Sequence, residues 1–278
     1  MKIATWNING IKARIDNLPK WLREAEPDVV CLQEVKSIDE NFPTAVFEDM
    51  GYNVAVHGQK SFNGVAILSK HAIEDVRRGL PGDGEDVQAR YIEARITVED
   101  LSVRIAGIYL PNGNPLGTEK FTYKLAWMKR LEAHARSMLQ GEEAFLIAGD
   151  YNVIPEPEDC RKPDNWLDDA LYQPESRDAY RQLLHLGFTD ALRATNAAPE
   201  TYTFWDYQAG AWNKNNGIRI DHMLLSPQAA DLLQTCAVDK HTRAWEKPSD
   251  HVPVWVELAA KPSASSMPGG EALTSQPV

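Results

Sequence analysis

Short apolar runs recur along residues 1–260, and most of them have the length of a β-strand. The run FLIA at residues 145–148 is typical of a buried strand and ends at Gly149. We predict strands at residues 2–8, 29–33, 52–56, 64–69, 91–98, 103–109, 144–148, 218–225 and 252–258.

Helical spacing of apolar residues appears between several of these runs. It is clearest over residues 118–140, which are followed by Gly141 as a stop signal. Residues 176–186 predict a second helix with Ser176 as its N-cap. Ser226-Pro227 predicts the start of a short helix. The segment NKNNGIRID carries an Asn-Gly pair ahead of a strand, which is a hairpin signal.

Many strands with interspersed helices, without strict alternation, favour a mixed α/β sandwich over a barrel or a doubly wound sheet. We expect one domain over residues 1–260. Residues 261–278 are rich in Pro, Ser and Gly and have few large apolar groups. We predict that this tail is disordered, because it cannot bury enough surface to offset its ordering entropy.

Composition indicates in which cellular compartment we expect the protein. The 278 residues are 43% hydrophobic, and no run approaches the length of a membrane span or has the pattern of a secretory signal. Cys31, Cys160 and Cys236 suggest neither a disulfide framework nor a zinc site, so we expect a cytoplasmic protein.

The formal net charge of −11 argues weakly against a polyanionic partner. Local basic stretches soften that argument because they can bind phosphate while the remaining surface stays acidic. One such stretch holds Lys120, Lys124, Lys129 and Arg130, although each lysine alone is more simply explained as part of a solvated face.

Polar residues stand where the predicted strands end. A carboxylate, an amide, a tyrosine or a histidine occupies each of these positions: Asn7, Glu34, Tyr109, Asp150, Asn152, Asp221, Asp250 and His251.

Each of these positions also has an ordinary structural explanation. Asp150 could form a turn, and Glu34 could open a solvated helix. Asp221 is harder to explain in this way, because a lone carboxylate inside a half-buried strand is costly unless it is paired. If the chain stays extended, alternation places Asp150 and Asn152 on one side and turns Tyr151 inward.

Taken together, the set suits phosphoryl chemistry. Hard oxygen ligands without a thiolate suit Mg²⁺ or Mn²⁺. Phosphoryl chemistry needs charge neutralisation, an activated nucleophile and donors to the transition-state oxygens, and this inventory supplies all of them.

The chain resembles the exonuclease III family of apurinic/apyrimidinic endonucleases, within the endonuclease/exonuclease/phosphatase superfamily. The motifs that carry the resemblance occur in the family's order: KIATWNINGIKAR, DVVCLQEVK, NGVAILSK, GIYLPNG, LIAGDYNVIP, GIRIDHMLLS and WEKPSDHVPV. The resemblance implies a four-layer α/β sandwich, in which two packed mixed β-sheets are flanked by helices.

The resemblance also implies roles for the strand-end residues. Glu34, with Asn7 and Asp250, matches the metal site, and a second ion would add Asp150, Asn152 and His251. Asp150 matches the residue that deprotonates the attacking water, and Asn152 and Tyr109 match groups that contact the phosphate. Asp221 and His251 match a pair in which the acid fixes the imidazole and the imidazole polarises the phosphoryl oxygen.

The resemblance places DNA contacts in loops around the site. The candidates that we name are Gly10, Lys12, Arg14, Arg90, Lys214 and Arg219, with Trp212 in a pocket for a flipped abasic sugar. We expect Phe204 and Trp205 to pack in the core instead.

The expected activity is Mg²⁺-dependent cleavage of duplex DNA 5′ to abasic sites, with 3′→5′ exonuclease and 3′-phosphodiesterase or phosphatase activity. Mn²⁺ is expected to substitute, and the protein is expected to be a monomer that acts on abasic or 3′-blocked duplexes without a membrane. Two alternatives remain open: a phosphatase or phosphodiesterase for inositol or lipid phosphates, and a damage-binding module without catalysis.

Overall fold

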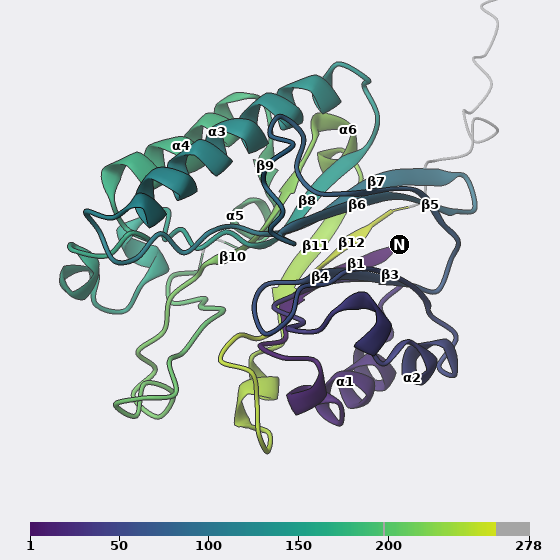
Figure 1. The fold of residues 1–278 in the computed structure, drawn as a ribbon, viewed down its shortest axis with the longest axis horizontal. Coiled ribbons are helices and arrows are strands. Elements are labelled where there is room, and N and C mark those ends of the chain that lie inside the picture. Colours follow the sequence, from purple (N-terminus) through teal and green to yellow (C-terminus); the bar gives the residue numbers. More distant parts are fainter. Residues whose placement is uncertain (197, 260–278) are drawn as a thin grey trace, which may run out of the picture.

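Two six-stranded mixed sheets pack face to face in the computed structural model, which describes residues 1–196 and 198–259. The first sheet has the order β11-β12-β1-β2-β4-β3 and the second has the order β5-β6-β7-β8-β10-β9. Helices cover the outer face of each sheet (Figure 1). The arrangement is the four-layer α/β sandwich expected from the sequence.

The strands of the first sheet are β1 (Lys2–Asn7), β2 (Val29–Gln33), β3 (Asn53–His57), β4 (Val65–Ser69), β11 (Leu233–Val238) and β12 (Val254–Leu258). Those of the second are β5 (Ile73–Arg78), β6 (Tyr91–Val98), β7 (Leu101–Tyr109), β8 (Phe145–Asp150), β9 (Thr189–Asp190) and β10 (Asp221–Leu225).

One parallel pair lies inside each sheet, and both pairs end at the same edge of the sandwich. Strand β1 runs parallel to β2, with Asn7 opposite Gln33. Strand β7 runs parallel to β8, with Tyr109 opposite Asp150. Since parallel strands carry their carboxyl ends to one edge, the polar residues at these ends gather there.

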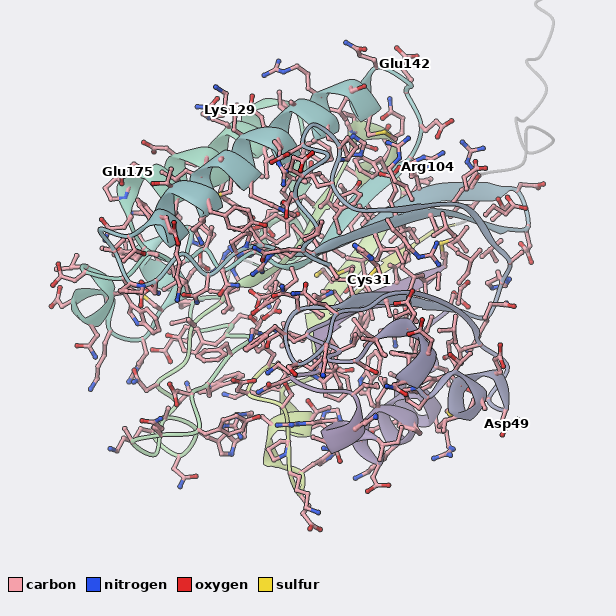
Figure 2. The ribbon with its side chains drawn as sticks, in the orientation of Figure 1. Cys31, Asp49, Arg104, Lys129, Glu142 and Glu175 are labelled. Carbon is pink, nitrogen blue, oxygen red and sulfur yellow. The ribbon has the colours of Figure 1, made fainter. Side chains whose placement is uncertain are left out.

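The core between the sheets is built from the inward faces of both. Figure 2 shows side chains filling this space, with Cys31 of β2 among them. A Cβ on Gly107 of β7 would lie 3.3 Å from the Sγ of Cys31, so the two sheets approach closely at this point. Burial of this apolar interface is the main favourable contribution to the stability of the fold.

The outer layers are formed by helices with apolar inner faces. Helices α3 (Glu119–Leu139) and α4 (Pro174–His185) cover the second sheet, and α1 (Asn17–Ala25) and α2 (Thr44–Glu48) cover the first (Figure 1). Two short helices, α5 (Ala191–Thr195) and α6 (Pro227–Ala230), complete the set in the described ranges. Within those ranges no helix is long and apolar enough to cross a membrane.

Several local predictions are confirmed. Helix α3 spans almost all of residues 118–140, and the Thr118 hydroxyl caps it by accepting from the backbone N–H of Lys120. The Ser226 hydroxyl caps α6 by accepting from the N–H of Ala229. Every predicted strand has a counterpart in the sheets, with boundaries that shift by a few residues at most positions.

The N-cap prediction for Ser176 was wrong. Helix α4 begins earlier, at Pro174, and the Ser176 hydroxyl donates instead to the carbonyl oxygen of Ala170 at 2.6 Å. Strand β10 also begins later than predicted, because Ile218 makes only isolated bridges to Phe204 and Cys160. The Asn-Gly pair therefore ends a longer loop, not a two-residue hairpin turn. The predicted tail, residues 261–278, lies outside the described residues.

Candidate active site

Three strand ends meet through the side chain of Asn7. Its amide nitrogen donates to Glu34 Oε1 and to Asp150 Oδ2, in both cases at 2.9 Å. Its amide oxygen accepts from the backbone N–H of Asn9 at 3.1 Å. Asn7 therefore links the two sheets at their common edge and fixes the spacing of two carboxylates.

A second set of contacts connects Asp150 to Asp221 through His251. The ring nitrogen Nδ1 of His251 lies 2.8 Å from Asp221 Oδ2, and Nε2 lies 3.7 Å from Asp150 Oδ2. The backbone N–H of Asp221 donates to the Thr203 hydroxyl at 3.1 Å, which anchors the start of β10. The buried carboxylate of Asp221 thus has the partner that its place in an apolar strand required.

The surroundings of His251 and Asp150 raise the pKa values of both side chains. Burial lowers the pKa of His251, but Asp221 and Asp150 outweigh it and raise the pKa to about 10. Burial raises the pKa of Asp150 to about 7, helped by Asp221 and opposed by His251. At neutral pH the imidazole is therefore a cation, and Asp150 is a stronger base than an ordinary aspartate.

Glu34 stays ionised despite its burial. Burial raises the pKa of Glu34, but Lys36 and the Asn7 amide outweigh it, so the pKa lies below its ordinary value. The Lys36 ammonium lies 2.9 Å from Glu34 Oε2 and donates to Asn9 Oδ1 at 2.5 Å. Asn9 in turn donates to Asp250 Oδ1 at 3.0 Å.

Glu34, Asp150 and His251 each offer an atom within 4.8 Å of the others, a grouping that is suited to a metal ion. Asp250 lines the same cavity, but its carboxylate is engaged by Asn9.

Tyr109 and the loop after β8 supply the remaining polar groups of the site. Burial, Glu34 and Asp150 raise the pKa of Tyr109 well above its ordinary value, so its hydroxyl keeps its proton. The Asn152 backbone N–H donates to Asp150 Oδ1 at 2.9 Å, and the Asn152 side-chain amide donates to the carbonyl oxygen of Leu110 at 2.8 Å. Asn112 donates to Asn152 Oδ1 at 3.2 Å.

The prediction that Tyr151 points inward is confirmed. It is buried against Tyr180 and His222, and its hydroxyl donates to the carbonyl oxygen of Ile147 at 3.0 Å. Asn152 adopts the left-handed conformation with φ of 47°, so the condition of an extended chain is not met. Asp150 and Asn152 nevertheless both face the cavity.

These groups line a cavity of about 350 Å³ whose walls combine polar and apolar side chains. Its walls are Glu34, Tyr109, Asn112, Asp150, Asn152, Trp166, Asp169, Leu171, Phe204, Asp206, Ile220, Asp250 and His251. Phe204 was expected in the core, but its ring lies 4.9 Å from that of His251, centroid to centroid, on the cavity wall.

Trp212 does not line this cavity. It packs edge-on against Trp205, with ring centroids 5.1 Å apart, and Lys240 lies over its ring. The aromatic wall of the cavity comes instead from Phe204 and from Trp166, which lies in a 3₁₀ turn that we did not single out.

The assignment of Arg219 to DNA contact was wrong. Its side chain is 1% exposed and forms ion pairs with Asp159 at 2.7 Å and Asp190 at 2.8 Å. Lys124 was expected in a basic surface stretch, but it too is buried, and burial lowers its pKa to about 7. Arg219 and Lys124 each stand between apolar residues in the sequence, but this pattern alone does not show that their side chains point into the interior.

Of the remaining predicted DNA contacts, Lys12 and Arg14 lie in a 3₁₀ helix (Lys12–Arg14) and the others lie in loops or turns. Lys12 and Lys214 are exposed, and Gly10 has φ of 97°, a conformation that favours glycine. Arg90 lies over the Tyr109 ring, 4.9 Å from its centroid. Arg14 donates to the Tyr207 hydroxyl at 2.6 Å and to the carbonyl oxygen of Asn9 at 2.8 Å.

Sequence reasoning missed several residues of the site. Asn9 and Lys36 hold the carboxylates of Asp250 and Glu34, and both stand two positions after a predicted site residue. This spacing of two positions could have identified Asn9 and Lys36 from the sequence. Trp166 had no such signal, because it reaches the cavity from a 3₁₀ turn that holds no predicted site residue.

Carboxylates, an imidazolium and amides at the shared edge of two packed sheets define a hydrolase of phosphate esters. The chain belongs to the endonuclease/exonuclease/phosphatase family, whose model matches residues 4–251.

Similar proteins place it close to nucleases. Exodeoxyribonuclease III of Haemophilus influenzae is 36% identical over 93% of this chain and 100% of that protein. An AP endonuclease from Archaeoglobus fulgidus has a TM-score of 0.87 at 37% identity, with 94% of this chain and 100% of that chain covered. The 3′ phosphatase NExo from Neisseria, bound to a product DNA hairpin, has a TM-score of 0.88 at 37% identity and the same coverage.

Proposed function

We propose that this chain is a Mg²⁺-dependent DNA repair nuclease of the exonuclease III type. It cuts duplex DNA 5′ to an abasic site and also acts on 3′ ends as an exonuclease and as a phosphodiesterase or phosphatase. The observation that carries the proposal is the continuous set of contacts Glu34–Asn7–Asp150–His251–Asp221 at one edge of the sandwich.

The donor set fits a hard divalent cation. Glu34 and Asp150 offer carboxylate oxygens, which Mg²⁺ and Mn²⁺ prefer, and Asp250 and the Asn7 amide lie beside them. His251 is a weaker candidate ligand, because a doubly protonated imidazole has no free lone pair. When bound, the ion supplies positive charge to the phosphate oxygens.

Asp150 is the proposed general base. Burial and Asp221 raise its pKa above that of an ordinary aspartate, which makes it a stronger base. Asn7 and the backbone N–H of Asn152 fix both carboxylate oxygens, which orients the group toward the cavity. Asp150 accepts the proton of the attacking water in this proposal.

His251, Asn152 and Tyr109 are the proposed donors to phosphate oxygens. His251 carries positive charge held by Asp221, and Tyr109 keeps its proton. The amides and hydroxyl are fixed before substrate arrives, so they need little reorganisation as charge develops on the phosphate. Asp221 acts through His251 and touches no substrate.

The DNA contacts that we propose surround this cavity. Lys12 and Lys214 are exposed cations for backbone phosphates, and Arg90 lies over the ring of Tyr109 on the cavity wall. Arg14, which donates to the carbonyl oxygen of Asn9, is a further candidate. Trp166, Phe204 and Leu171 form the apolar wall against which a sugar without a base would rest.

We further propose a single catalytic domain over residues 1–260 that works as a monomer. Three buried, unpaired cysteines support a reducing compartment such as the cytoplasm.

A substrate panel tests the proposal against inositol or lipid phosphates. We expect turnover on an abasic-site duplex and on a 3′-phosphate duplex with Mg²⁺, and none with EDTA. Efficient hydrolysis of inositol phosphates without cleavage of either DNA would contradict it. Binding of abasic DNA without cleavage, unchanged by Asp150→Asn, would favour a non-catalytic module.

A further inference from the structure

Lys124 lies on α3 but does not face solvent. Its side chain is 0% exposed, and it is the one lysine that is buried among the described residues. Lys129, on the same helix, projects from the outer surface (Figure 2). A buried ammonium is costly unless its N–H groups are hydrogen-bonded, so the contacts of Lys124 must offset this cost.

The ammonium of Lys124 reaches two loops of the candidate active site. It donates to the carbonyl oxygens of Pro111 and Asn112, each at 3.2 Å, and to that of Asn152 at 2.6 Å. These acceptors match the number of donors that an ammonium carries, so the three carbonyl oxygens favour the protonated form against the effect of burial. One loop follows β7 and the other follows β8, so a single side chain ties together the segments behind Tyr109 and Asp150.

The stem of Lys124 is fixed as tightly as its head. A Cβ on Gly113 would lie 2.6 Å from Cδ of Lys124, and Gly113 has φ of 90°, so glycine is required there. The loop after β7 thus wraps closely around the lysine and leaves little freedom for its side chain.

The contact with Asn152 is the one that bears on chemistry. Asn152 has the left-handed φ of 47°, and the acceptor of the shortest Lys124 hydrogen bond is its carbonyl oxygen. The same residue supplies the side-chain amide that the proposed function aims at the phosphate. That amide is further held by Leu110 and Asn112, on the other loop.

We propose that Lys124 is a positioning residue, which holds the backbone of Asn152 and the loop after β7 so that the Asn152 amide and Asp150 face one phosphate. This inference rests on the proposed function. Lys124 touches no substrate and acts through Asn152.

The test replaces Lys124 with methionine, which keeps the length of the stem and removes every donor. We expect kcat on a cleavable duplex to fall about 10- to 100-fold, since small displacements of catalytic groups have effects of this size. The Kd for an uncleaved duplex in Ca²⁺ should change less than about threefold, because the DNA-facing side chains are untouched. Lys129→Met on the same helix is the matched control and should leave kcat unchanged.

A double-mutant cycle separates positioning from simple stabilisation. If Lys124 acts through Asn152, Lys124→Met should have little further effect on kcat in an Asn152→Ala background. Additive effects, or a kcat of Lys124→Met within twofold of the wild type, would overturn the inference. Should Lys124→Met fail to fold, Lys124→Gln enters the same cycle; if neither variant folds, Lys124 is a stability residue only and the inference is wrong.

Failure of the proposed function is distinguishable from failure of this inference. Wild-type protein that cuts no DNA substrate contradicts the proposed function. Wild-type protein that cuts normally, together with a fully active Lys124→Met variant, contradicts the role of Lys124 alone.

Discussion

His251 and Asp221 are joined by a contact of 2.8 Å between Nδ1 and Oδ2, and both side chains are almost fully buried. The second oxygen of Asp221 is buried without a hydrogen-bond partner within the described ranges. The carboxylate therefore depends on the positive charge of His251, and the charge of His251 depends on the carboxylate.

The first prediction follows from this dependence. Asp221→Asn keeps the shape but removes the negative charge that raises the pKa of His251. His251 is then protonated only to a lower pH, so the alkaline limb of the rate profile should move to lower pH. We also expect kcat at neutral pH to fall about 100-fold or more, the size of effect seen when a donor to the transition-state charge is lost. An unchanged alkaline limb would show that the charge of His251 is not used.

A second prediction concerns Glu34 and metal. Added Mg²⁺ should raise the unfolding temperature of the wild type, because a ligand that binds only the folded state stabilises it. Glu34→Gln should abolish the shift, since the amide offers a weaker oxygen ligand without charge. Differential scanning fluorimetry with and without Mg²⁺ measures this, and an equal shift in both proteins would remove Glu34 from the metal site.

The buried cluster of Arg219, Asp190 and His222 predicts how stability depends on pH. The Arg219 guanidinium donates to Asp190 and lies 3.0 Å from Nδ1 of His222. Burial and Arg219 lower the pKa of His222 from 6.5 to about 4, so the unfolded chain takes up the proton first as pH falls. The contribution of His222 to the free energy of unfolding should therefore be lost as pH falls from 6.5 to 4, against the opposite trend from Asp150, whose raised pKa lets the folded chain take up a proton first.

Asp190 extends this loss to lower pH. Burial raises the pKa of Asp190, but Arg219 outweighs it and lowers the pKa from 3.8 to about 2. The stability that it contributes is present above 3.8 and is lost as pH falls toward 2. Urea unfolding across this range is the measurement; His222→Gln should flatten the upper part of the curve and leave the lower part.

Gly149 predicts a steric effect at the end of β8. A Cβ at this position would lie 2.0 Å from the carbonyl oxygen of Ile108 in β7, far inside contact distance. Gly149→Ala should push the strands apart, lower the free energy of unfolding by about 2 kcal/mol and displace Asp150. Chemical denaturation and kcat measure both effects. Full activity at wild-type stability would mean that this edge of the sheet adjusts freely.

Lys12 tests the DNA face. It is exposed, so Lys12→Ala should weaken duplex binding similarly for all sequences. It should also reduce the slope of log Kd against log salt by about 1, as expected when one phosphate contact is lost. A slope identical to that of the wild type would remove Lys12 from the interface.

The sequence predicted the central strands of the fold because they are buried on both faces and carry continuous apolar runs. Strand β5 was not predicted, because it is an edge strand with the sequence IEDVRR and only two of its residues are half-buried. Strand β11 is an edge strand of the first sheet, and its sequence also mixes polar and apolar residues. Edge strands need only one buried face, so their apolar signal is weaker.

Strand-end residues such as Asn7 and Asp150 could be predicted as site residues because parallel strands share an edge. Arg219, Lys124 and Phe204 could not be placed in the same way. The direction of each side chain depends on partners distant in sequence, such as Asp159 for Arg219 and the loop carbonyls for Lys124. A charged residue in a polar loop and one that turns into the interior look alike until those partners are known.

The most direct test of the central claim is cleavage of an end-labelled duplex that contains a single abasic site. With Mg²⁺ we expect one cut 5′ to the site, leaving a 3′-hydroxyl and a 5′-deoxyribose phosphate. EDTA or Asp150→Asn should abolish the cut without abolishing binding. An intact duplex in Mg²⁺, under conditions in which the AP endonuclease from Archaeoglobus fulgidus cleaves it, would contradict the account.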